Sequence, residues 1–210
     1  MEIGFGFDKI TDDYKIVILS NPDINEGTPQ SSLVYAMKTR IWCTIAPPNF
    51  IYTKVASNGC FVNGELHWVV ERYNGRRRYI LTFDLSTHVF GMIVLPQFRY
   101  TTKQLTTING SLTVISVYMF GIWIWVRRDD SWFLVFSSKR NKLKGGLKRI
   151  LQTTTNGDFL FKTMLGRAHL YYPKIGKQSR LVNFNSASNI CDMQLCVESL
   201  EWIDMETTFE

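Results

Sequence analysis

The sequence predicts an all-β protein, and three observations support that prediction. Aromatic residues make up 14% of the 210 residues, and flat or β-branched side chains pack well on the pleated face of a strand. Apolar residues recur at every second position in several segments, which is the period of a strand. Asn-Gly dipeptides, which suit the positive φ angles of type I′ hairpin turns, separate these segments.

The expected strands are clearest where apolar and polar positions alternate. Such rows predict strands around residues 65–70, 79–85 and 132–136, and we expect Trp68, Trp125 and Trp132 to lie in the core. Near the start, Gly4 and Gly6 predict a close approach of another segment to the backbone. The rows are Leu66, Trp68 and Val70; Tyr79, Leu81, Phe83 and Leu85; and Trp132, Leu134 and Phe136.

Three Asn-Gly turns recur at a regular interval. Asn63, Asn109 and Asn156 are 46 and 47 residues apart, and each precedes a short apolar strand. A repeat of this length with several short strands is typical of a β-propeller blade. Three or so blades are fewer than a closed ring normally has, so we predict a partial propeller of antiparallel four-stranded blades with open edges.

A second landmark is Phe-Asp-x-x-Thr, which occurs at residues 7–11 and again at 83–87. Asp and Thr side chains can bond nearby backbone amides and so stabilise a turn. We expect the Asn-Gly turn to start one inner strand of a blade and the Asp/Thr turn to close the next hairpin.

One segment has helical spacing. In residues 139–151, four apolar residues recur at helical intervals among Lys and Arg. Gly145 and Gly146 interrupt the pattern, and each costs a helix about 1 kcal/mol relative to Ala. We therefore expect a basic loop that leads into a strand.

Composition excludes several classes of protein. No secretory signal opens the chain, and the longest nearly apolar stretch, residues 114–126, is too short to span a bilayer as a helix. We expect a soluble protein with reduced thiols. The four cysteines form no CxxC pair, and a Cys191–Cys196 disulfide is possible only on spacing. The cysteines are Cys43, Cys60, Cys191 and Cys196.

The sequence contains no convincing set of catalytic residues. His67, His88 and His169 have no identifiable nucleophile or metal-ligand partners. The acid pairs at 12–13 and 129–130 are better interpreted as turn acids, because adjacent strand residues point to opposite faces. We expect no enzymatic activity, no cofactor and no metal. A kelch-type oxidase or hydrolase is the alternative, and it would need convergent Tyr and His ligands.

The net charge of +6 and the isoelectric point near 9.2 raise nucleic acid as a partner. A nucleic-acid-binding basic β module is therefore a second alternative. Stacking surfaces need exposed aromatic residues, whereas the aromatics here fall mainly at strand-core periodicity, so we favour an acidic protein partner. The candidate partner-binding residues are Arg76, Arg77, Arg78, Arg127, Arg128, Lys142 and Lys144.

Two segments together carry a family resemblance. GFGFDKITDDYKIVIL at residues 4–19, and NGELHW at 63–68 with YILTFDLSTHVFGMIVLP at 79–96, resemble the F-box-associated interaction domain of plants, a kelch-like β-propeller module. The resemblance extends to about Leu200. It implies one domain over residues 1–202, followed by an acidic tail at 203–210.

The resemblance also implies a function. Proteins of this family recognise the substrate of a cullin–RING (SCF) ubiquitin ligase in the cytoplasm or nucleus, so the implied partner is a protein. An F-box would have to precede Gly4, where the chain has no room for it, so we expect no binding to the Skp adaptor. The chain is then a truncated relative, a partial gene model or an excised domain.

Overall fold

The computed structural model describes residues 1–20, 32–48, 52–55, 59–72, 78–96, 102–118, 121–139, 147–153, 158–163, 168–172 and 177–180. Every regular element in these ranges is a strand. The ranges contain no helix that could cross a membrane. The all-β prediction is confirmed. The acidic tail at 203–210 lies outside the described residues.

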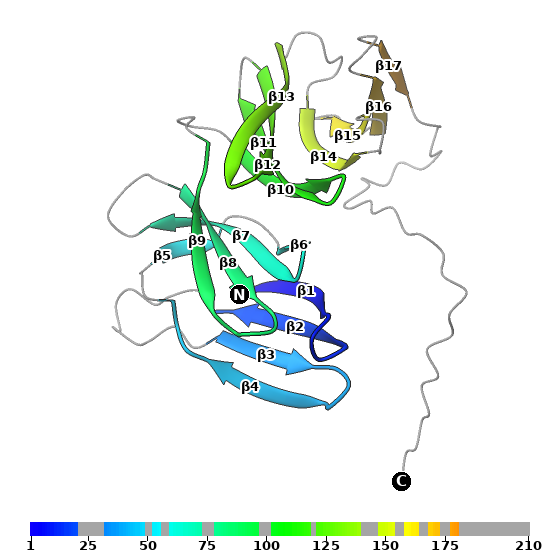
Figure 1. Cartoon of the computed structure of the whole chain (residues 1–210). Helices are drawn as coiled ribbons and strands as arrows, with labels where there is room; N and C mark the ends of the chain where they lie inside the picture. Colours follow the sequence, from blue (N-terminus) through cyan, green and yellow to red (C-terminus); the bar gives the residue numbers. More distant parts are fainter. Residues whose placement is uncertain are drawn as a thin grey trace, which may run out of the picture.

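The strands form four antiparallel sheets that follow the order of the chain (Figure 1). Sheet A contains β1 (Glu2–Asp8), β2 (Asp13–Leu19), β3 (Ser32–Ala36) and β4 (Ile41–Ile45). Sheet B contains β5 (Tyr52–Val55), β7 (Glu65–Arg72), β8 (Arg78–Asp84) and β9 (Phe90–Val94), and β6 (Cys60–Val62) also pairs with β7.

Sheet C contains β10 (Thr102–Ile108), β11 (Ser111–Tyr118), β12 (Gly121–Arg128) and β13 (Ser131–Lys139). Sheet D contains β14 (Leu147–Thr153), β15 (Phe159–Thr163), β16 (Ala168–Tyr172) and β17 (Lys177–Arg180). Neighbouring strands in each sheet are antiparallel, as in propeller blades. The structure has one sheet more than the three Asn-Gly repeats indicate, because sheet A forms without such a turn.

The Asn-Gly turns have the predicted geometry where they are described. Asn63 and Gly64 have φ angles of 50° and 89°, and Asn109 and Gly110 have φ angles of 50° and 73°. These positive values are those of a type I′ turn. Each turn leads into the second strand of its sheet, β7 or β11. The third turn, at Asn156, lies outside the described residues, although β15 follows it.

Three apolar clusters join successive sheets face to face. Sheet B is buried on both faces, because Leu66 and Trp68 pack towards sheet A while Val69 and Ile80 pack towards sheet C. Trp68 is fully buried, as predicted. Trp125 and Trp132 are half-buried against the cluster between sheets B and C. A third cluster joins sheets C and D around Ile122 and Phe159.

The predicted row Trp132, Leu134 and Phe136 does not share one face. The pairing of β12 with β13 shifts between Ile124 and Trp125, so Trp125 faces Leu134 and Ile124 faces Phe136. One extra residue in β13 reverses the alternation of side chains. Phe136 therefore packs between sheets C and D, Trp132 packs between sheets B and C, and Leu134 is 46% exposed.

The basic segment leads into a strand, as predicted. Leu147 begins β14, which is the first strand of sheet D. The glycines Gly145 and Gly146, with Lys142 and Lys144, lie outside the described residues.

The glycines of β1 allow sheet B to approach closely. A Cβ atom added at Gly4 would lie 2.5 Å from Cζ2 of Trp68, and one added at Gly6 would overlap the Phe61 ring and lie 2.8 Å from Cδ1 of Leu85. Real Cβ atoms essentially never have such contacts, so the prediction of a tight backbone approach is confirmed.

We expect Gly6→Ala to lower the free energy of unfolding by roughly 1–3 kcal/mol, the usual cost of overpacking a core. Urea unfolding of the purified chain measures it. Adding Phe61→Leu, which removes part of the ring that the new methyl group meets, should restore some of the loss. A Gly6→Ala protein as stable as the wild type would contradict the close approach.

Candidate protein-interaction surface

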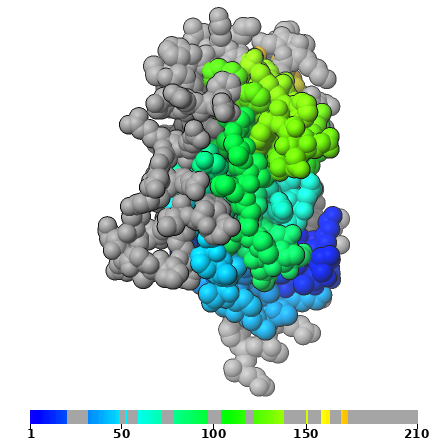
Figure 2. Space-filling view, turned by 60° about the vertical axis from the view of Figure 1, so that its left-hand side comes forward, coloured from blue at the N-terminus to red at the C-terminus, as the bar shows by residue number. Residues whose placement is uncertain are grey.

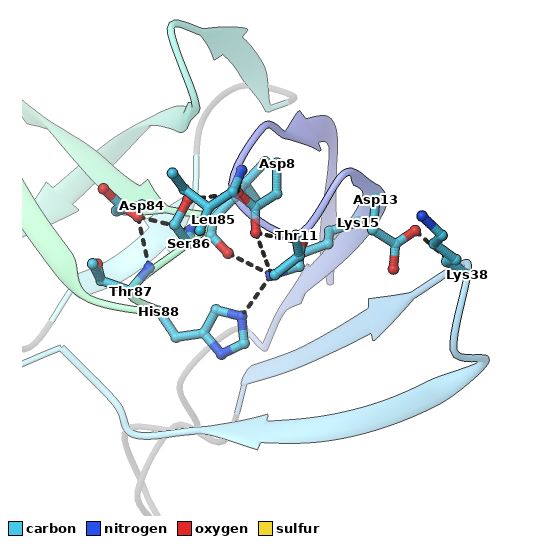
Figure 3. A network of polar contacts seen from close by, with 11 residues as sticks. Asp8, Thr11, Asp13, Lys15, Lys38, Asp84, Leu85, Ser86, Thr87 and His88 are labelled. Carbon is cyan, nitrogen blue, oxygen red and sulfur yellow. Dashed lines mark hydrogen bonds and ion pairs between the residues drawn. The ribbon is translucent and has the colours of Figure 1, made fainter.

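The two Asp/Thr turns meet in space although they are far apart in sequence (Figure 3). Asp8 accepts hydrogen bonds from the Ile10 amide at 2.9 Å and the Thr11 hydroxyl at 2.7 Å. Asp84 accepts from the amides of Ser86 and Thr87, both at 2.8 Å. The predicted side-chain-to-backbone bonds are therefore present. However, the first turn joins β1 to β2, whereas the second joins β8 to β9, so the motif occupies different positions in its two sheets.

Lys15 links these turns from inside the protein. Its ammonium group is 2.8 Å from Oδ2 of Asp8 and 2.7 Å from the carbonyl oxygen of Leu85. It also lies 3.3 Å from Nε2 of His88, and the Ser86 hydroxyl donates to Asp8 at 2.6 Å. The Lys15 side chain is 6% exposed and that of Asp8 is fully buried. The buried ion pair lies within sheet A, and its contacts with Leu85, Ser86 and His88 join it to the turn that follows β8 of sheet B.

The surroundings set the charge of each group in this network. Burial acts to raise the pKa of Asp8, but the hydrogen bonds from Lys15, Ser86, Thr11 and Ile10 outweigh it and hold that pKa well below its usual value. Burial, followed by the positive charge of Lys15, lowers the pKa of His88. A lysine ammonium group can only donate, so Lys15 donates the hydrogen bond and the unprotonated Nε2 of a neutral His88 ring accepts it.

The network is suited to holding sheets A and B together. The partners saturate the carboxylate of Asp8, and the network contains no activated nucleophile.

The described cysteines and the other two histidines lie apart from this network. Burial raises the pKa of the half-buried Cys60 thiol to about 11, while Cys43 is exposed and free. His67 is buried in β7 with Nδ1 3.2 Å from the carbonyl oxygen of Cys60, and His169 stacks on Phe161.

A third turn lies against the first. The amide of Lys38 donates to Oδ1 of Asp13 at 2.8 Å, and the amide of Met37 donates to the carbonyl of Tyr14 at 3.0 Å. We call the three segments together, residues 8–13, 37–40 and 85–89, the turn platform. The acid pair belongs to it: Asp12 lies in the turn, as predicted, and Asp13 begins β2.

The turn platform presents apolar and basic side chains to solvent. Ile10 is 81% exposed and Val89 is 61% exposed. Lys9 and Arg40 are also exposed, and the ammonium group of Lys38 pairs with the Asp12 carboxylate at 3.2 Å. Large apolar side chains that are exposed on well-bonded turns are suited to contact with another protein.

The structure describes three of the predicted basic residues, and two of these three form an ion pair. Arg78 begins β8, and its Nη2 is 2.6 Å from the Glu71 carboxylate. Arg127 is the last residue but one of β12 and pairs with Asp130 at 2.7 Å, beside exposed Arg128. Arg76, Arg77, Lys142 and Lys144 lie outside the described residues. Two of the predicted cations are thus already paired with an acid of the same hairpin.

Sequence interpretation missed Lys15 and the platform. A signal was present, because Lys15 shares its face of β2 with Val17 and Leu19, which are fully buried. A lysine at a core-facing position needs a buried acid as a partner. The alternation alone could not identify that partner as Asp8.

Comparisons with known proteins support the family resemblance. A family model described as the F-box associated beta propeller domain matches residues 1–190. Two Arabidopsis thaliana proteins, each named "Putative F-box protein", align with 46% and 82% of this chain, at 31% and 24% identity. These alignments cover 26% and 47% of the two relatives, so the chain spans at most about half of their length.

A solved structure also resembles the chain. It is an auxiliary nutrient binding protein from Bacteroides ovatus, with 12% identity and a TM-score of 0.48 over 84% of this chain and 46% of that one. The propeller architecture follows from the family match, and the more specific likeness to kelch blades stays a prediction.

We expect Lys15→Met to destabilise the protein by roughly 3–5 kcal/mol, because it leaves the Asp8 carboxylate buried without its cation. Lys38→Met is the matched control: its ion pair with Asp12 is exposed, so it should cost at most about 1 kcal/mol. Urea unfolding of both variants measures the difference. Equal losses would contradict a special role for the buried pair.

The difference between wild type and Lys15→Met should also depend on pH. The pKa of Asp8 is lower in the folded protein than in the unfolded chain, where it is about 4. The stability that ionised Asp8 contributes is therefore complete above about pH 4 and is lost as the pH falls towards the folded pKa. The gap in unfolding free energy should therefore shrink in acid.

Proposed function

Because the chain belongs to the F-box associated β-propeller family, we propose that it is a protein-interaction domain that recognises the substrate of a ubiquitin ligase. The observation that carries the proposal is the family match over residues 1–190. In this proposal the domain belongs to the cullin–RING (SCF) pathway, acts in the cytoplasm or nucleus, and performs no chemistry itself.

The turn platform is the surface on which we place the substrate. Ile10 and Val89 offer apolar contacts that are 81% and 61% exposed. The hydrogen bonds of Asp8 and Asp84 hold their turns in place, so binding loses little backbone entropy. The exposed cations Lys9 and Arg40 favour a target with an acidic surface, chiefly through a faster rate of association.

The alternative functions have less support. In the described ranges, no group of three or more His, Cys, Asp or Glu could hold a metal ion. For nucleic acid, two of the candidate partner-binding cations, Arg78 and Arg127, are paired with Glu71 and Asp130. A protein partner therefore remains the proposal, with Arg76, Arg77, Arg128, Lys142 and Lys144 as further basic candidates.

The matched variants Val89→Glu and Val135→Glu test the platform. Val89 belongs to the platform, while Val135 is 49% exposed on β13, away from it in sequence and sheet. Proteins captured from plant extract by the immobilised chain are quantified by mass spectrometry for wild type and both variants. We expect a set of acidic proteins that Val135→Glu retains and Val89→Glu loses by about tenfold or more, since each 1.4 kcal/mol of binding energy is tenfold. Equal capture by both variants would contradict the platform as the binding site.

The same proposal predicts that residues 1–210 do not bind the Skp adaptor. The family match already occupies residues 1–190, and adaptor binding is the task of the F-box. A pull-down with purified Skp adaptor and this chain tests it, with a full-length F-box protein as the positive control. Stoichiometric binding would mean that this chain contains an adaptor-binding surface.

A further inference from the structure

The outermost strand of sheet B has a free edge on the molecular surface. In Figure 2 the green surface that contains β9 lies between the blue atoms of sheet A and the yellow-green atoms of sheet C. Within the described residues, β9 pairs with β8 and with no other strand. Sheet B already has a neighbouring sheet on each face. A further propeller blade, which packs face to face, would therefore leave this edge open.

The direction of the main-chain groups along β9 follows from its pairing with β8. The Asp84 amide donates to the Val89 carbonyl at 3.0 Å, so Val89 directs its carbonyl towards β8. This direction alternates from residue to residue in an antiparallel pair, and the pairing of β8 with β9 has no register shift. Phe90, Met92 and Val94 therefore direct their N–H and C=O groups away from β8, along the free edge.

The two ends of this edge differ. At one end, the Trp132 indole of sheet C donates to the Val94 carbonyl at 2.8 Å, which agrees with the outward direction of this carbonyl and closes that end. At the other end, Phe90 directly follows Val89 of the turn platform. The open groups are thus the N–H and C=O of Phe90 and Met92, and a strand added there can extend only over the platform.

The side chains of this edge are apolar. Residues 90–94 include no charged residue and no proline, which are features that protect open edges from pairing with another chain. The side chains of Met92 and Val94 are 43% and 63% exposed. The edge is therefore suited to an extended segment with apolar side chains.

We propose that an extended, apolar segment of the substrate adds to β9 as a further strand of sheet B. Alternating N–H and C=O groups are matched by another extended main chain, whose hydrogen bonds supply affinity while its side chains supply specificity. The inference rests on the proposed function, because the added strand continues onto the turn platform.

A second copy of this chain matches the edge less well. Two β9 strands related by a two-fold axis run antiparallel to each other. If Phe90 of each copy lies opposite Met92 of the other, the turn before β9 meets the Val94 end of its partner, which Trp132 closes. A substrate segment brings no such turn.

Peptide probes and two variants of one residue test the strand addition. Short random peptides displayed on phage are selected on the immobilised full chain, and fluorescence polarisation measures the affinity of the synthesised peptides. Met92→Pro removes an outward N–H and should raise the dissociation constant about tenfold or more. Met92→Ala keeps that N–H and should stay within about threefold of the wild type. Equal affinities of the two variants, or a selection that yields no peptide, overturn the proposal.

A proline whose missing N–H would face solvent is tolerated on an edge strand, and thermal unfolding verifies that Met92→Pro is folded. If it is not, N-methylated peptides give the same comparison on the wild-type chain. Methyl groups on one set of alternate amides should abolish binding, and methyl groups on the other set should not. Equal effects of the two sets overturn the proposal.

Capture from plant extract separates this inference from the proposed function. Proteins that Val89→Glu loses and Met92→Pro retains would overturn the strand addition and leave the platform in place. Proteins that both variants retain would overturn both. Sedimentation velocity of the wild type completes the test, since a dimer that Met92→Pro dissociates would identify a second copy as the occupant and overturn the proposal.

Discussion

The ammonium group of Lys15 is buried between two sheets, and its partners come from both of them. Asp8 ends β1, while Leu85 and His88 follow β8. An ammonium group removed from water costs several kcal/mol unless acceptors replace the lost hydration. The ammonium group can reach all three acceptors only when sheet A lies in one particular position against sheet B. The contacts of Lys15 with this turn therefore select the relative placement of the first two sheets, in addition to any contribution to stability.

The glycines of β1 complete that constraint from the apolar side. Gly4 and Gly6 leave the space that Trp68 and Phe61 of sheet B fill, so the strand can approach closely enough for Asp8 to meet Ser86. The same closeness aligns the turns that follow β1 and β8. The turn platform is thus a consequence of core packing, because its position is set by buried residues behind it and not by the exposed residues that would touch a partner.

Local patterns in the sequence predicted the local features well. The I′ turns at Asn63 and Asn109, the burial of Trp68 and the side-chain bonds of Asp8 and Asp84 each depend on a few neighbouring residues. The failures involve distant residues. The bulge in β13 depends on pairing with β12, so alternation in β13 alone could not show that Phe136 turns to the opposite face. Likewise, no local pattern indicated that Lys15 would contact the turn around Ser86, which lies 71 residues further along the chain.

Strand ends and sheet faces have different roles in this architecture. The faces stabilise the fold, because each apolar face that is covered by a neighbouring sheet removes aromatic and aliphatic surface from water. The ends lie outside those clusters, so Ile10 and Val89 can vary with little effect on packing, provided that Asp8, Lys15 and Asp84 keep the turns in place. If the platform binds the substrate, as we propose, a change of target requires new side chains on the platform only.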